Sequence, residues 1–246
     1  MTDWSVISKY VSMAPRRSQS DRAKACVKER TGARAGTRRA AVPAQENRQA
    51  ERRLAILEAA LSEFSERGFS AARLDDVARR AGIAKGTIYL YFRDKETLFA
   101  ELIRTRLVPL VGTLQHLRET DIPIRVLAER LIDLFVDEVF ATPRKDVIRL
   151  MIGEGARFPK LAEFYYREVL GPVMDTLGDL LRRAHQRGEI ADDALARFPQ
   201  LLAAPGVVAI VWNGLFDRFA PLDVRALMRA HVDLILGQGP QRGNRQ

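Results

Sequence analysis

Residues 74–92 read LDDVARRAGIAKGTIYLYF and decide the fold of the N-terminal part of this chain. Apolar side chains recur at helical spacing over residues 74–81 and again over residues 85–91. The tripeptide Gly-Ile-Ala at 82–84 separates the two stretches, and its glycine provides the backbone freedom that a tight turn needs. Two short helices joined by such a turn are typical of a helix-turn-helix.

The second helix of this motif presents a polar face. Lys85 provides positive charge, Gly86 exposes backbone, and Thr87, Tyr89 and Tyr91 provide hydroxyl groups. Such a surface suits the major groove of DNA, which is lined by phosphates. Thr87 is predicted to read a base edge, and the lysine and the tyrosines to hold phosphates. The alternative for the two tyrosines is a place in the core with satisfied hydroxyls.

Helical periodicity continues on both sides of the motif. Leu54, Leu57, Leu61 and Phe64 fall on one helical face, and Gly68 follows as a C-cap. These residues predict the first of three helices in an N-terminal helix-turn-helix domain.

A long helix is predicted to follow the motif. Asp94 is a suitable N-cap, and the apolar face after it continues through Leu110 and Leu114. Lys95 stands at the start of this helix, where a cation opposes the helix dipole. A phosphate contact by Lys95 would explain that position.

The remainder of the chain is also helical in pattern. No window shows a sustained period of two, so we expect an all-α protein with about nine helices. Gly171–Pro172 should kink or split one of the later helices. The later helical stretches are 123–140, 144–157, 161–187, 195–217 and 223–236.

The positive charge is concentrated near the N-terminus. The net charge of the whole chain is +9, with +7 in residues 1–50, +2 in 51–106 and zero in 107–246. Such asymmetry indicates a polyanionic partner near the N-terminus, either nucleic acid or an anionic membrane surface. The domains expected are a basic disordered arm at 1–47, a DNA-binding domain at 48–94, a ligand-binding and dimerisation domain at 95–237, and a flexible tail at 238–246.

The arm has more than one interpretation. Its arginines could add affinity for DNA without sequence choice. It could instead be a solvated leader, an organellar address, or the product of an upstream start codon, with Met13 as an internal candidate start.

Several function classes are excluded by the sequence. A single cysteine, Cys26, rules out an internal disulfide framework and a cysteine-based zinc site, and the three histidines are far apart. The longest apolar run, 201–212, is too short to span a bilayer. No catalytic set or phosphate loop is present. We therefore expect a cytoplasmic protein that is not an enzyme and has no cofactor, metal or membrane partner.

Residues 55–102 resemble the DNA-binding domain of TetR-family transcriptional regulators, most specifically in AGIAKGTIYLYFRDKETL at 81–98. Residues 149–169 resemble the AefR-like subgroup of C-terminal domains. The helix before the turn usually begins with Thr or Ser in this family, and here Arg73 stands near that place. Ala84 replaces a second usual hydroxyl. Arg73 is expected to replace one phosphate contact by charge.

The resemblance implies a ligand-responsive repressor. It would bind a near-palindromic operator on double-stranded DNA as a homodimer, and a small lipophilic effector would release it. The rival interpretations are a DNA-compacting protein without sequence preference and an enzyme that uses the C-terminal cavity.

Two further residue sets follow from this expectation. A cavity in the C-terminal domain is predicted to be lined by Leu110, Leu114, Phe135, Met151, Glu154, Phe158, Tyr165, Met174 and Trp212. Glu154 and Tyr165 are its expected polar groups. The last two long helices are rich in apolar residues and are predicted to form the dimer interface. Its expected members are Leu201, Leu202, Val208, Val211, Leu215, Leu227 and Leu234.

Overall fold

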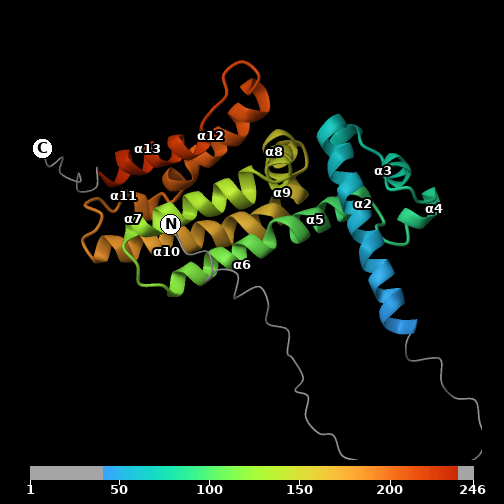
Figure 1. Ribbon diagram of the computed structural model, residues 1–246, viewed down its shortest axis with the longest axis horizontal. Helices are drawn as coiled ribbons and strands as arrows, with labels where there is room; N and C mark the ends of the chain where they lie inside the picture. The colour runs from blue at the N-terminus through green and yellow to red at the C-terminus, as the bar shows by residue number, and fades with distance from the viewer. Residues whose placement is uncertain (1–40, 238–246) are drawn as a thin grey trace, which may run out of the picture. The chain divides into compact units, whose positions relative to one another are not determined.

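The computed structural model describes residues 41–237, which form helices joined by turns, with no strand among them (Figure 1). The expected all-α class is confirmed. No helix in this described part has both the length and the apolar character that a membrane span requires.

The helices follow one another along the chain in three groups. The N-terminal group is α2 (Ala41–Ala71), α3 (Leu74–Arg80), α4 (Lys85–Ile88) and α5 (Lys95–Arg106). The middle group is α6 (Val108–His116), the 3-10 turn η1 (Leu117–Glu119), α7 (Ile124–Asp133), the π-helical turn η2 (Leu134–Phe140), α8 (Arg144–Glu154) and the 3-10 turn η3 (Gly155–Arg157). The last group is α9 (Pro159–Tyr165), the π-helical turn η4 (Tyr166–Leu170), α10 (Gly171–Gln186), α11 (Ala194–Arg197), α12 (Gln200–Phe216) and α13 (Val224–Leu236).

The first described helix begins earlier than expected. α2 starts at Ala41, so the end of the expected arm at 1–47 is helical. Pro43 is tolerated there because the first turn of a helix has no intrahelical partner for its N–H groups. The rest of the expected arm, residues 1–40, lies outside the described residues, as does the expected tail at 238–246.

The predicted helix after Asp94 is two helices. Asp94 caps α5 as expected, and its carboxylate accepts a 2.7 Å hydrogen bond from the backbone N–H of Thr97. The helix then ends at Arg106, with Leu107 at φ −108°. Pro109 explains the break, because proline lacks an N–H and its ring clashes with the carbonyl four residues earlier. The apolar face through Leu110 and Leu114 therefore belongs to α6.

A cluster of phenylalanine rings fills the core around α2 and α5. The ring centroids of Phe64, Phe69 and Phe99 lie 5.3–5.4 Å apart, and Phe158 packs edge-on against Phe69 at 4.7 Å. Buried residues of α8 and α9, among them Val147, continue the same core. The expected boundary at 94/95 is therefore not a break in packing.

The later helices pack around two smaller apolar clusters. α10 packs against α6, α7 and α11, and α13 packs against α7 and α12 (Figure 1). Pro205 lies inside α12 and donates no hydrogen bond to the carbonyl of Leu201. A ring nitrogen of His231 lies 2.7 Å from that carbonyl oxygen and occupies the vacant position, which joins α13 to α12.

Candidate nucleic-acid interface

The turn between α3 and α4 is fixed by buried apolar side chains. Val77 and Ile88 are fully buried, and Ala78 is small where the two helices meet. The backbone N–H of Ile83 donates to the carbonyl of Ala78 at 3.0 Å. Gly82 has φ +67°, a conformation that side chains with a Cβ rarely adopt. The predicted helix-turn-helix is therefore present, with the glycine in the expected role.

A buried carboxylate ties α3 to α2. Glu63 forms ion pairs with Arg67 and Arg80, with nitrogen–oxygen distances of 3.0 and 3.2 Å. Arg80 also pairs with Glu66 at 2.5 Å. Because Glu63 is almost completely buried, these guanidinium groups offset the desolvation of its charge. The sequence signals only the local Glu63–Arg67 spacing and gives no sign of the link to α3.

Both helices of the motif begin without a side-chain cap. Arg73 precedes α3 and Ala84 precedes α4, and neither side chain accepts a capping hydrogen bond. Asp75 and Asp76 in the first turn of α3 offset part of the loss, because negative charges interact favourably with the positive N-terminal end of the helix dipole. Arg73 is exposed. Its phosphate contact stays a prediction.

One carboxylate contacts two of the side chains that are predicted to bind DNA phosphates. Asp75 Oδ2 lies 2.7 Å from Lys85 Nζ, and Asp75 Oδ1 accepts from the Tyr89 hydroxyl at 3.4 Å. The lysine hydrogen bond is the main cause that lowers the pKa of Asp75 and raises the pKa of Lys85. The pair is therefore charged at neutral pH, and its attraction is lost when the pH falls through the lowered pKa of Asp75 or rises through the raised pKa of Lys85. Asp75 thus orients both groups before any ligand arrives.

The second helix of the motif, α4, is shorter than predicted. α4 ends at Ile88, and residues 89–91 form a turn rather than a further helical turn. Thr87 is half-buried, and Tyr91 is half-buried against the main core. Leu90, for which the sequence pattern predicted no role, is 84% exposed. Ile88 and Phe92, by contrast, are fully buried.

Lys95 has an internal role that its position in the sequence did not indicate. Its ammonium group donates to the carbonyls of Phe69 at 2.9 Å and Ser70 at 2.7 Å, and it lies over the Phe69 ring at 4.9 Å. These contacts explain a cation at the start of α5, because it satisfies carbonyls at the end of α2. A phosphate contact is therefore not required to explain the position of Lys95, and Lys95 is not among the phosphate-binding residues proposed below.

The predicted pocket residues do not all belong to one apolar cluster. Met151, Phe158 and Tyr165 contribute to the main core, where burial raises the pKa of Tyr165 to about 12. Phe135 instead packs against a different cluster. Trp212 is partly exposed on α12, and its indole N–H donates to the carbonyl of Ala220 at 2.8 Å. The remaining members are Leu110 and Leu114 on α6 and Met174 on α10.

Glu154 lies where the C-terminal helices meet the end of α2. A Cβ placed on Gly68 would lie 2.8 Å from Glu154 Oε1. Glu154 Oε2 is 3.8 Å from a guanidinium nitrogen of Arg157 and has no hydrogen-bond partner among the described residues. The sequence predicted a ligand-orienting role for this carboxylate, whereas the structure places it against the helix that ends at Gly68.

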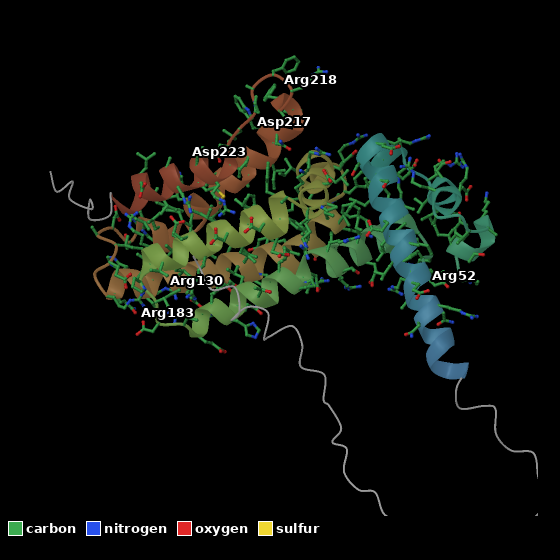
Figure 2. The ribbon with its side chains drawn as sticks, in the orientation of Figure 1. Arg52, Arg130, Arg183, Asp217, Arg218 and Asp223 are labelled. Carbon is green, nitrogen blue, oxygen red and sulfur yellow. The ribbon has the colours of Figure 1, made fainter. Side chains whose placement is uncertain are left out.

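Two concave sites on the described part of the chain contain none of the predicted pocket residues. One is lined by charged and polar side chains of η1 and α10, including Arg118 and Arg183. Figure 2 labels Arg183. The other lies between residues 190–195 and the end of α13 at 235–237. Within residues 41–237 no cluster of three or more His, Cys, Asp or Glu side chains could hold a metal ion.

The predicted dimer residues differ in their exposure. Leu202 and Leu227 are half-buried and pack partly onto the internal clusters, which leaves them less surface for a partner. Val211 is half-buried. The four remaining members are exposed: Leu201, Val208, Leu215 and Leu234. The exposed face of α12 also carries Val207, Trp212 and Phe216, which the prediction did not include.

Comparisons with known proteins agree with this architecture. The model of bacterial regulatory proteins of the tetR family matches residues 56–102, and a tetracyclin repressor-like C-terminal domain matches residues 127–235. The HTH-type transcriptional repressor BepR of Brucella suis is 33% identical over 150 residues, which cover 58% of this chain and 71% of BepR.

Two further proteins are similar to this chain. The HTH-type transcriptional regulator YdgC of Bacillus subtilis is 39% identical over 95 residues, which cover 36% of this chain and about half (49%) of YdgC. The structure of SmeT with triclosan has a TM-score of 0.64 at 20% identity, covering 77% of this chain and 93% of SmeT, and this likeness shows the fold. BepR and YdgC are both described as HTH-type transcriptional regulators or repressors. The chain is a DNA-binding transcriptional regulator, and it belongs to the TetR family of bacterial regulatory proteins.

Proposed function

We propose that this regulator is a repressor that binds a near-palindromic operator as a homodimer and is released by a small lipophilic molecule. The observation that carries the DNA part is the exposed surface of α4, where Lys85 and Tyr89 are positioned by one carboxylate. A DNA phosphate replaces the Asp75 carboxylate as the partner of these groups. Binding therefore exchanges one anion for another and does not require the side chains to find a new orientation.

Dimerisation is supported by the exposed apolar face of α12. Leu201, Val208 and Leu215 follow one another at seven-residue intervals, and Leu215 is 62% exposed. A contiguous apolar face of this kind is unusual on a monomer in water. Pairing two copies of α12 about a two-fold axis buries it, and isologous pairing places two reading heads on successive half-sites about 34–36 Å apart.

The release mechanism is supported by direct contacts between the C-terminal helices and the reading head. Phe158 packs on Phe69, and Glu154 lies against Gly68, so α8 and α9 touch the end of α2. An effector that displaces α8 also moves these contacts. SmeT forms a complex with triclosan, a lipophilic molecule, which supports the class of effector proposed for this chain.

Sequencing of DNA fragments that the purified protein selects from a random pool tests the proposal. We expect one near-palindromic sequence with two half-sites, bound by a dimer in sedimentation experiments. Equal affinity for all duplexes at fixed salt would instead support the DNA-compacting alternative.

A panel of fatty acids, acyl thioesters and lipophilic phenols, triclosan included, then tests release. The expected result is a loss of operator affinity with at least one compound. A dimer that selects DNA but responds to none of them contradicts the effector part alone.

A further inference from the structure

Leu90 is the most exposed large apolar side chain among residues 47–237, with 84% of its surface accessible. It lies in the turn directly after α4 and belongs to none of the buried clusters of the described chain. Its neighbours Ile88 and Phe92 are fully buried and hold the turn in place. The protein therefore fixes the backbone on both sides of Leu90 while leaving its side chain in water.

The α4 segment has two outward faces with different chemistry. Lys85 and Tyr89 are four residues apart, and both reach Asp75. Gly86 and Leu90 are also four residues apart in the sequence, and both are exposed. Leu90 lies in the turn after α4, where its backbone N–H donates to the carbonyl of Thr87 at 3.1 Å.

The space around the backbone of Gly86 is open. A Cβ placed on Gly86 would meet no atom within 4 Å, so no side chain covers this part of the backbone. A bare backbone next to a projecting leucine lets a flat surface approach α4 closely. The polar face with Lys85 then lies to one side, at a place suited to the phosphates.

The major groove offers one apolar group to such a side chain, the C5-methyl of thymine. We propose that Leu90 contacts a thymine methyl in each half-site and is a specificity-determining residue. This proposal rests on the proposed mode of DNA binding. It assigns direct base reading to Leu90, because the half-buried Thr87 has less surface to offer.

Replacement of thymine by deoxyuridine tests this contact, because it removes only the methyl group. The probe is the duplex selected by the wild-type protein, with each thymine replaced in turn. Burial of one methyl-sized group corresponds to about a fourfold change in the dissociation constant. We expect this loss at one thymine of each half-site, and about 15-fold when both symmetry-related thymines are replaced.

The Leu90→Ala variant should bind the thymine duplex about as weakly as the wild type binds the deoxyuridine duplex. It should also no longer distinguish the two duplexes. Its affinity for a random duplex and its melting temperature should equal those of the wild type. Leu54→Ala removes another exposed leucine from α2 and is the matched control that keeps the deoxyuridine effect. Tyr89→Phe should weaken binding to every duplex and should also keep the deoxyuridine effect.

The proposal is overturned if no single deoxyuridine weakens wild-type binding, or if Leu90→Ala keeps the deoxyuridine penalty. It is also overturned if Leu90→Ala changes the sedimenting species, since the leucine then serves a protein contact. A wild-type protein that selects no sequence contradicts the proposed function itself, which separates the two failures.

Discussion

Gly68→Ala should destabilise the protein for two separate reasons. Gly68 ends the straight part of α2 at φ +75° and ψ 160°, a region that only glycine occupies readily. The added methyl would also lie 2.8 Å from Glu154 Oε1. The carboxylate ends a flexible side chain, so this side chain must shift to relieve the contact.

The size of the effect follows from the two contributions. A residue with a Cβ in this backbone region costs about 1–3 kcal/mol. Overpacking against a neighbour costs about 1–3 kcal/mol more. For a chain of this size each kcal/mol lowers the melting temperature by about 2–4 °C. The expected decrease in melting temperature is therefore about 4–24 °C.

Thermal melting followed by circular dichroism measures this change, at one protein concentration because dimerisation shifts the midpoint. Glu154→Ala separates the two contributions, since it removes the atom that the new methyl would meet. The double variant should recover the overpacking part and keep the backbone part. Gly82→Ala is a matched control: its φ is +67°, but a Cβ there would meet nothing within 4 Å.

A melting temperature of Gly68→Ala within 1 °C of the wild type would refute both contributions. If the full decrease persists in the Glu154→Ala background, the contact with Glu154 contributes nothing to it, and only the backbone explanation survives. A larger decrease for Gly82→Ala than for Gly68→Ala would also contradict the reasoning, because Gly82 has the strain without the clash.

Other substitutions test the DNA surface, the dimer face and the α12–α13 junction. Lys85→Ala should weaken selected and random duplexes alike and reduce the salt slope of binding by about one; an unchanged slope means that no phosphate is held. Leu215→Glu and Val208→Glu should each give monomers at micromolar concentration in sedimentation, and a dimer in both variants would exclude this face. His231→Ala should lower the unfolding free energy by about 0.5–1.5 kcal/mol in urea titrations, and Pro205→Ala should recover much of it by restoring a helical N–H for the unpaired carbonyl.

The sequence determined those features that depend on neighbours within one or two helical turns. The spacing of apolar residues in 74–92 specifies two short helices, and glycine allows the positive φ values at position 68 in α2 and at position 82 after α3. The Asp94 cap likewise needs only Thr97, three residues away. Such local rules explain why the helical class and the helix-turn-helix could be predicted correctly.

The break at Leu107 shows the limit of periodicity. The apolar pattern continues without interruption into α6 and by itself predicts a single helix, despite Pro109. The proline determines the local geometry because the missing hydrogen bond and the steric clash act within one turn. A pattern of burial therefore predicts which face is apolar and not whether the helix is continuous.

Only the tertiary structure decided which of two apolar residues faces a neighbour and which faces water. Leu201 and Leu202 are adjacent and equally apolar, yet the first is exposed and the second packs inside. The same holds for the partners of charged groups, since Lys95 reaches carbonyls 25 and 26 residues earlier in the chain. Helical periodicity fixes the angle between successive side chains around one helix. The packing of other helices against it determines which face of that helix is buried.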